Sequence, residues 1–247
     1  MQRDVVSHRS RALLLAGVVG LLLAAGAPPG EARPVPPRPT VELGSVARLA
    51  VDGKSVEVDL IASCPEKWTV VEAVVTVSQG QASGEAPFPL TCTGGNKLFT
   101  ATLPSPNVPF QLGEAQAAAS VVIQRGRTEQ AQDSRVVRVV PTVVADLADT
   151  ALLEGGGQAA SIDVTVACPV GASGQQSYVN ISQGPASGFG FFVPTCDGQP
   201  HTFTVRVQAS QGLFQAGSAQ GSAFVVVEAG GDVFFGEDNQ PMQIIAT

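Results

Sequence analysis

Residues 55–64 read Ser-Val-Glu-Val-Asp-Leu-Ile-Ala-Ser-Cys, and residues 159–168 read Ala-Ala-Ser-Ile-Asp-Val-Thr-Val-Ala-Cys. In both stretches apolar and polar side chains alternate, which is the period of a β-strand with one buried face. The cysteines that end the stretches, Cys64 and Cys168, lie 104 positions apart, and each is followed by proline. The two stretches therefore predict the same half-buried strand, formed twice in one chain.

The repeat extends well beyond this strand. With a shift of 104 residues, 24 of the 68 positions from Val56 to Ile123 are identical without a gap. Upstream, Pro39-Thr40-Val41 recurs as Pro141-Thr142-Val143, a shift of 102, which predicts that the second copy gained two residues at Gly155-Gly156-Gly157. We predict two tandem domains, repeat 1 at residues 41–141 and repeat 2 at residues 142–247, after a proline-rich leader at residues 33–40.

Composition and turn spacing predict an all-β fold. Gly and Pro are abundant, with 27 and 18 residues, and they interrupt Val-rich runs that suit short strands. About seven strands in each copy, with a turn every 8–12 residues, favour an immunoglobulin-like Greek-key β-sandwich, and a small barrel is the alternative. In repeat 1 we expect strands at 46–50, 55–64, 70–78, 86–92, 98–103, 115–124 and 135–140.

The N-terminus has the pattern of a secretory signal peptide. Basic Arg3, Arg9 and Arg11 precede the uncharged stretch Ala12–Ala27, which is short for a membrane span. We place cleavage after Ala32, giving a signal peptide at residues 1–32, with an uncleaved anchor as the alternative. The expected location is secreted or extracellular, with the cell envelope possible, and without a stable membrane anchor after cleavage.

The four cysteines predict two structural disulfides. An even cysteine count in an exported chain favours bridges over free thiols. Because a bridge present in both copies of a repeat should lie within each copy, we pair Cys64 with Cys92 and Cys168 with Cys196. A metal or redox site would need closely spaced cysteines and histidines, which this sequence does not provide.

Several short motifs carry a resemblance. They are Cys64-Pro65, the Ser-Gln-Gly elements at 78–80 and 182–184, and Cys196-Asp197-Gly198. With them the chain resembles exported, immunoglobulin-like β-sandwich repeat domains of actinobacterial type, a group without an assigned activity. The resemblance implies a fold and an export route only. In size, acidity and Ala/Gly/Val bias the chain is also similar to the enediyne-antibiotic apoproteins, although those domains carry two disulfides each at other spacings.

Candidates for chemistry are few. After the signal peptide His201 is the only histidine, and a Ser-His-Asp triad would depend on it. Glu57 and Asp59 lie on one outward strand face, and Asp163 repeats Asp59, which favours a solvated face over a glycosidase pair. We predict no catalytic residue and no cofactor. A weak calcium candidate is the cluster Asp232, Glu237 and Asp238.

Charge is distributed unevenly between the copies. Residues 41–140 hold eight basic and ten acidic residues, whereas residues 141–247 hold nine acidic residues and Arg206 as the one basic residue. Such a surface repels phosphate backbones, so nucleic acid is excluded as a partner. The acidity could steer a cationic partner to repeat 2, and simple solubility is the other interpretation.

Aromatic residues distinguish the copies further. Phe88, Phe99 and Phe110 recur as Phe192, Phe203 and Phe214, the pattern of core positions. We expect Phe224 to lie in a strand and to pack inside the domain. Exposed together, phenylalanines in Gly-flanked segments would form an apolar patch of the kind that marks partner sites. The candidate partner patch comprises Trp68, Phe189, Phe191, Phe234 and Phe235. The alternative for these side chains is packing within the sandwich or at the domain junction.

These features predict a non-enzymatic binding or spacer protein, monomeric, whose partner is an extracellular or envelope protein or a small molecule. The alternatives are a small-molecule carrier or inhibitor with an apolar site in repeat 2 and, third, an extracellular hydrolase.

Overall fold

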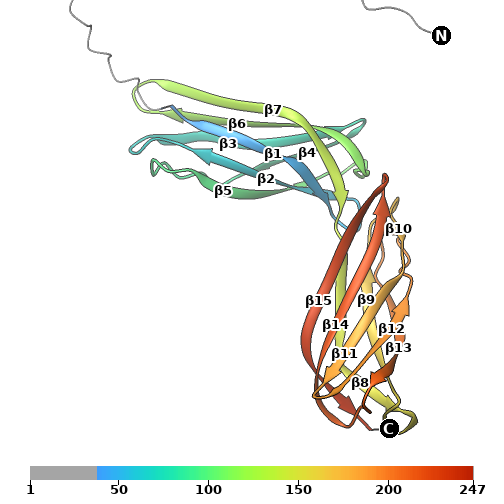
Figure 1. Ribbon diagram of the computed structural model, residues 1–247. Helices are drawn as coiled ribbons and strands as arrows, with labels where there is room; N and C mark the ends of the chain where they lie inside the picture. Colours follow the sequence, from blue (N-terminus) through green and yellow to red (C-terminus); the bar gives the residue numbers. More distant parts are fainter. Residues whose placement is uncertain (1–37, 247) are drawn as a thin grey trace, which may run out of the picture. The chain divides into compact units, whose positions relative to one another are not determined.

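The computed structural model describes residues 38–246, which form two all-β units with separate cores (Figure 1). The predicted signal peptide and most of the leader lie outside the described residues. Strands account for nearly all regular structure, and one 3₁₀ turn spans Gly155–Gly157. Among residues 38–246 no helix has the length and apolar character needed to cross a membrane.

Repeat 1 has seven strands in the hydrogen-bonded order β4-β3-β6-β7-β1-β2-β5. Strand β1 pairs antiparallel with β2, and its last residues, Val46 to Leu49, also pair parallel with β7. The β1–β2 register shifts at a bulge between Leu43 and Ala47, and Ala47 to Leu49 lie between β2 and β7. The strands are β1 (Thr40–Leu49), β2 (Ser55–Ser63), β3 (Thr69–Gln79), β4 (Ala82–Pro87), β5 (Lys97–Pro104), β6 (Gly113–Gln124) and β7 (Thr128–Pro141).

Repeat 2 uses the same topology with one added short strand. Its order is β10-β14-β11-β12-β13-β9-β8-β15, and β14 also pairs with β15. The strands are β8 (Val144–Glu154), β9 (Ala159–Ala167), β10 (Ser173–Gly174), β11 (Ser177–Gln183), β12 (Ala186–Phe192), β13 (His201–Gln211), β14 (Gly217–Ala229) and β15 (Asp232–Ile245).

The predicted immunoglobulin-like sandwich is confirmed, and repeat 2 adds a barrel-like feature. Its β12 hydrogen bonds to β13, so the pairings run through every main strand and return to β14. In the described part of repeat 1, by contrast, no pairing joins β4 to β5. Gly190 permits this close approach of β12 and β13, because a Cβ there would lie 2.6 Å from the carbonyl oxygen of Arg206. Repeat 1 has Ala86 in place of Gly190.

Strand register corrects one detail of the repeat. Leu43 pairs with Leu60 and Leu147 with Val164, both before the same bulge, so the shift is already 104 at this point. The β8–β9 turn has the same length as the β1–β2 turn, since Leu49 pairs with Val56 and Leu153 with Ala160. The prediction that Gly155-Gly156-Gly157 holds two extra residues is therefore wrong.

The strand expected at residues 86–92 is also misplaced. The observed strand β4 begins at Ala82, directly after the two-residue turn Gly80-Gln81 that joins it to β3. It ends at Pro87, and neither Pro87 nor Pro89 has an N–H to donate to a sheet. The segment instead buries Phe88 and Leu90 in the core on the way to Cys92.

Both predicted disulfides are present, Cys64–Cys92 and Cys168–Cys196. Each joins the end of the second strand of a repeat to the loop before the strand that pairs with it.

Each repeat also has an equivalent hydrogen bond between an aspartate side chain and the backbone of its first strand. Asp133 accepts the backbone N–H of Leu43 at 2.8 Å, and Asp238 accepts that of Leu147 at the same distance.

Candidate functional site

A row of aromatic side chains in mutual contact crosses the outer face of repeat 2, with two stacked pairs and one edge-to-face pair. Ring centroids are 6.4 Å apart between Phe189 and Tyr178, 5.4 Å between Tyr178 and Phe224, and 5.2 Å between Phe224 and Phe235. These four residues lie on β12, β11, β14 and β15, which are neighbours in the sheet (Figure 1). We call them the aromatic row.

Strand alternation places the row on the outside. In β11, Ser177 and Val179 are fully buried, so Tyr178 between them faces outward. In β14, Ala223 and Val225 are buried on either side of Phe224. The expectation that Phe224 packs inside is therefore wrong, because small residues fill the inward positions of this strand.

The row is substantially exposed at its ends. Phe189 is 46% exposed and Phe235 is 58% exposed, whereas Tyr178 and Phe224 are half-buried by their neighbours. Phe191, 63% exposed, lies directly opposite Tyr178 in the β11–β12 register and widens the apolar area. Contiguous exposed aromatic surface of this kind is characteristic of interaction sites.

Repeat 1 has no counterpart of the row. By register, Val74, Glu85, Ser120 and Gln130 occupy the positions of Tyr178, Phe189, Phe224 and Phe235. Gln130 Nε2 donates to Ser120 Oγ at 3.5 Å, in the place of the Phe224–Phe235 stack. A shallow groove of about 460 Å³ lined by Val74 and Ser120 occupies the centre of this face. The fold thus forms without the aromatic residues.

Two members of the predicted patch lie elsewhere. Phe234 faces the opposite side of β15 from Phe235 and packs, partly buried, against the core of repeat 2. Trp68 is partly buried against the core of repeat 1, with the Arg127 guanidinium 5.9 Å from its ring centroid. The structure brings Phe189, Phe191 and Phe235 together and adds Tyr178 and Phe224, which the sequence interpretation had not included.

The three carboxylates of the calcium candidate, Asp232, Glu237 and Asp238, do not form one site. Glu237 and Asp238 are adjacent in β15 and therefore point to opposite faces. Asp238 accepts a hydrogen bond from the backbone N–H of Leu147, and Asp232 is the first residue of the strand. Within the described residues, no group of three or more metal-binding side chains forms a site.

The residues proposed for a hydrolase also have structural partners. Nε2 of His201 lies 2.9 Å from Oδ1 of Asp197, which also accepts the backbone N–H of Gln199. The hydrogen bond from His201 is the main cause of the lowered pKa of Asp197. The contact joins residues four apart on either side of one turn and has the form of a turn-stabilising pair.

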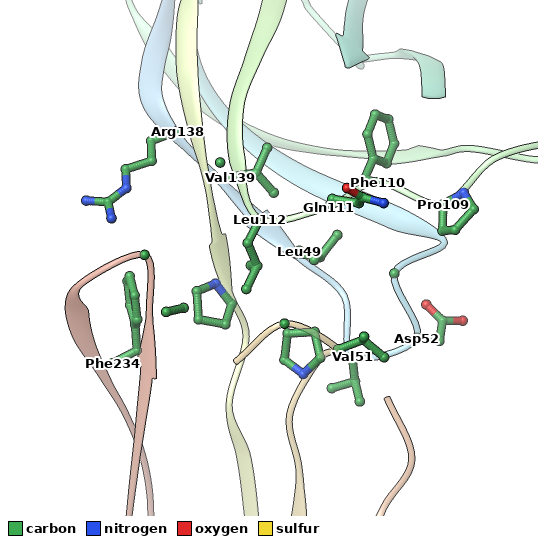
Figure 2. A pocket seen from close by; sticks show the side chains of 18 residues that line it. Leu49, Val51, Asp52, Pro109, Phe110, Gln111, Leu112, Arg138, Val139 and Phe234 are labelled. Atoms are coloured by element: carbon green, nitrogen blue, oxygen red, sulfur yellow. The ribbon is translucent and has the colours of Figure 1, made fainter. Parts of the chain in front are cut away.

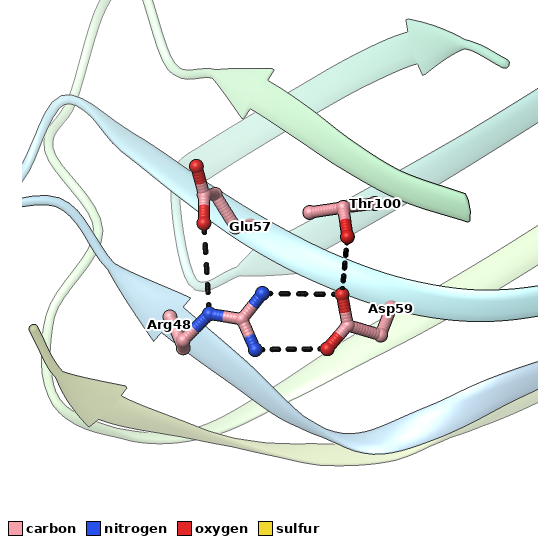
Figure 3. Close-up of polar contacts among 4 residues, drawn as sticks. All are labelled: Arg48, Glu57, Asp59 and Thr100. Carbon is pink, nitrogen blue, oxygen red and sulfur yellow. Dashed lines mark hydrogen bonds and ion pairs between the residues drawn. The ribbon is translucent and has the colours of Figure 1, made fainter. Parts of the chain in front are cut away.

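The Glu57 and Asp59 carboxylates are held by one arginine (Figure 3). Arg48 Nη1 and Nη2 donate to the two oxygens of Asp59 at 2.8 and 3.1 Å, and its Nε lies 3.5 Å from Glu57. Thr100 Oγ1 donates to Asp59 at 2.6 Å. The hydrogen bond from Arg48 is the main cause of the lowered pKa of Asp59. A general acid needs a raised pKa, so this pair is suited to joining strands rather than to donating protons.

Apolar side chains gather at one end of repeat 1. There the N–H of Phe110 donates to the carbonyl of Gly53 at 2.9 Å, which ties the β5–β6 connection to the β1–β2 turn. Figure 2 shows Pro109 and Phe110 with Leu49 and Leu112 in this region. Phe110 and Leu49 are buried in the core of repeat 1, so these side chains serve packing.

Repeat 2 has a pocket of about 340 Å³ beside β8, β14 and β15. Its lining residues are Asp149, Thr150, Ser218, Pro241, Met242 and Gln243.

Comparison with known proteins gives weak structural likenesses. No family model matches the chain, and no curated protein matches it. A tetra-tandem repeat from the extending region of a large adhesion protein is 16% identical, with a TM-score of 0.31, 84% of this chain covered and 49% of that chain. The fibronectin(III)-like modules of Clostridium thermocellum CbhA are 16% identical, with a TM-score of 0.28, 84% of this chain covered and 94% of that chain. Salmonella α-2-macroglobulin is 15% identical, with a TM-score of 0.29, 83% of this chain covered and 16% of that chain. The chain thus spans less than two thirds of the adhesion and macroglobulin chains, and these values assign it no function.

Proposed function

We propose that this chain is an exported, non-enzymatic binding protein in which the aromatic row of repeat 2 recognises a partner and repeat 1 serves as a spacer. The observation that carries the proposal is the difference between two repeats with one topology: the row is present in repeat 2, and polar or small side chains replace it in repeat 1. Since the fold does not require the row, its presence on an exposed face supports a role in binding.

Physical chemistry supports this role. Aromatic side chains contribute large areas to interfaces at low conformational cost and are enriched among the residues that dominate binding energy. Here the rings also contact one another, so their side chains lose little further conformational entropy when a partner binds. Phe189, Phe191 and Phe235 at the rim would supply most of the newly buried area.

Export is proposed from two features. The N-terminal pattern predicts a signal peptide, and each repeat contains one disulfide. Structural disulfides persist in oxidising compartments outside the cytosol. Both features agree with a secreted or cell-envelope location.

The test is partner capture by residues 33–247 from the producer's envelope and culture supernatant. The test variant carries the repeat 1 residues in the row: Tyr178→Val, Phe224→Ser and Phe235→Gln. The matched control changes the same face of repeat 1, with Val74→Ala and Ser120→Ala. We expect the row variant to lose the captured partner and the control to retain it. Equal capture by both variants, or no partner for the unchanged protein, would contradict the proposal and favour a passive spacer.

A further inference from the structure

We infer that the partner of the aromatic row is a positively charged polypeptide that presents lysine or arginine side chains to this face. The inference rests on the proposed binding function and specifies the chemistry of the partner. It is drawn from the carboxylates that share the outer face with the row.

Two glutamates lie on this face. Glu237 is directly opposite Phe224 in the β14–β15 register, and it is two residues from Phe235 on the same side of β15. Glu228 lies opposite Val233, two residues beyond Val226, which pairs with Phe235. Both glutamates are exposed, and strand alternation places both on the outer face.

Repeat 2 does not neutralise these carboxylates itself. Within the described residues neither glutamate forms a salt bridge, and Glu228 accepts a single hydrogen bond at 3.4 Å from the Gln175 amide. Arg206, the one basic residue of repeat 2, pairs on β13 with Glu154 at 2.8 Å. A partner that covers Glu228 and Glu237 would therefore have to supply the positive charge that neutralises them.

Desolvation decides which partner fits. A wholly apolar partner placed over Phe224 and Phe235 would cover Glu237 without a counterion, and burying an unpaired carboxylate is costly. A lysine or arginine side chain would neutralise the carboxylate, and its charged group is also attracted to the face of an aromatic ring. Phe189 and Phe235, the exposed rings at the two ends of the row, suit such contacts.

Two other occupants fit less well. A second copy of this face would bring Glu228 and Glu237 against identical glutamates, and like charges oppose that association. A saccharide chain binds aromatic side chains through exposed ring faces, but Tyr178 and Phe224 each have aromatic neighbours on both sides. The middle of the row therefore presents ring edges rather than faces.

The sequence provides a probe of the site, because Tyr178 is the only tyrosine in the chain. With 3-fluorotyrosine incorporated into residues 33–247, the ¹⁹F spectrum has one signal, and it comes from the aromatic row. The ligand probes are two synthetic nonapeptides of alternating valine and arginine or valine and citrulline. Citrulline retains the shape of arginine and removes its charge.

We expect the arginine peptide to shift the Tyr178 signal saturably and the citrulline peptide to bind about fivefold or more weakly. Glu237→Gln with Glu228→Gln should weaken arginine-peptide binding by a similar factor. The control Asp146→Asn with Asp149→Asn removes the same charge from β8 and should leave binding unchanged. No saturable shift with the arginine peptide, or equal binding by the glutamine variant, would overturn the inference.

The outcomes separate this inference from the proposed function. If both peptides bind equally and the Tyr178, Phe224 and Phe235 replacements abolish capture from the culture, the binding function stands and the charge requirement falls. The same holds if the captured partner resists protease and is cleaved by glycosidases, or if the Tyr178 signal shifts with protein concentration alone. If the row replacements leave capture intact, the binding function itself fails.

Discussion

Tyr178 and Phe224 stack across the β11–β14 strand pair with 5.4 Å between ring centroids and 30° between ring planes. The corresponding pair in repeat 1 is Val74 and Ser120, on strands in the same register. A cross-strand aromatic pair can stabilise a sheet by a fraction of a kcal/mol up to about 1 kcal/mol. That contribution is small beside the core, so the stack is better explained by what it presents to solvent.

Replacing the row with repeat 1 residues should change stability little. For Tyr178→Val, Phe224→Ser and Phe235→Gln together we expect a loss of about 1–2 kcal/mol in unfolding free energy, since these side chains lie outside the core. Phe214→Ala, at a position 2% exposed, should cost about 3–5 kcal/mol. Denaturant unfolding followed by far-UV circular dichroism compares them. A row variant as unstable as Phe214→Ala would mean that the row is structural.

Closure of repeat 2 should depend on Gly190. A Cβ there would lie 2.6 Å from both the carbonyl oxygen of Arg206 and Cγ1 of Val205, so Gly190→Ala should destabilise repeat 2 by about 1–3 kcal/mol. Gly95→Ala, where a Cβ meets nothing within 4 Å, is the control and should have little effect. Hydrogen exchange at β12 and β13 measures the local loss. Unchanged protection of these strands in Gly190→Ala would contradict the steric explanation.

Acid should weaken repeat 1 through Asp133. The hydrogen bond from the Leu43 backbone is the main cause of the lowered pKa of Asp133, with further contributions from Arg135. Because the folded pKa lies below the unfolded one, the stabilisation is complete above pH ~4 and is lost as pH falls through the folded value. Asp133→Asn should therefore lower stability at pH 7 and flatten its decline below pH 4.

Trp68 fluorescence follows this change, because it is the only tryptophan and packs on the core of repeat 1. Asp146→Asn in repeat 2 is the control and should leave the Trp68 transition unaltered. A decline below pH 4 that is as steep in Asp133→Asn as in the unchanged protein would contradict the assignment.

Each disulfide should stabilise its own repeat. Closing a loop between cysteines 28 residues apart is worth about 3–4 kcal/mol in the chain-entropy account. Cys64→Ala with Cys92→Ala should lower the denaturation midpoint that Trp68 fluorescence reports for repeat 1. Cys168→Ala with Cys196→Ala should lower the midpoint that the ¹⁹F signal of Tyr178 reports for repeat 2, and each pair should leave the midpoint of the other repeat unchanged. A fall in both midpoints from either pair would show that the repeats do not unfold independently.

The architecture was predictable from the sequence because many separate positions indicate the same repeat and the same strands. Identities spread over 68 positions defined the repeat, and alternation from Val56 to Leu60 defined a strand with one buried face. The same repeat identified the disulfide partners without any geometry. Where proline removed hydrogen-bond donors, as at Pro87 and Pro89, the strand assignment was wrong.

The site was only partly predictable, because it depends on side-chain direction and on strand neighbours. Consecutive Phe234 and Phe235 must face opposite ways, and only the register of β15 with β14 shows that Phe235 is the outward one. The alternation around Tyr178, between Ser177 and Val179, could have placed it outside. Its position beside Phe224 requires β11 to lie next to β14, a pairing between segments more than 40 residues apart that no local pattern specifies.

The most direct test of the binding face is site-specific photocrosslinking at matched positions of the two repeats. Phe191, beside the row on β12, and its repeat 1 counterpart Pro87 on β4 are each replaced by p-benzoylphenylalanine in residues 33–247, which are irradiated with the producer's culture and envelope material. We predict a covalent adduct from position 191 and none from position 87. An adduct from position 87 alone, equal adducts from both, or none from either would contradict a partner site on the aromatic face of repeat 2.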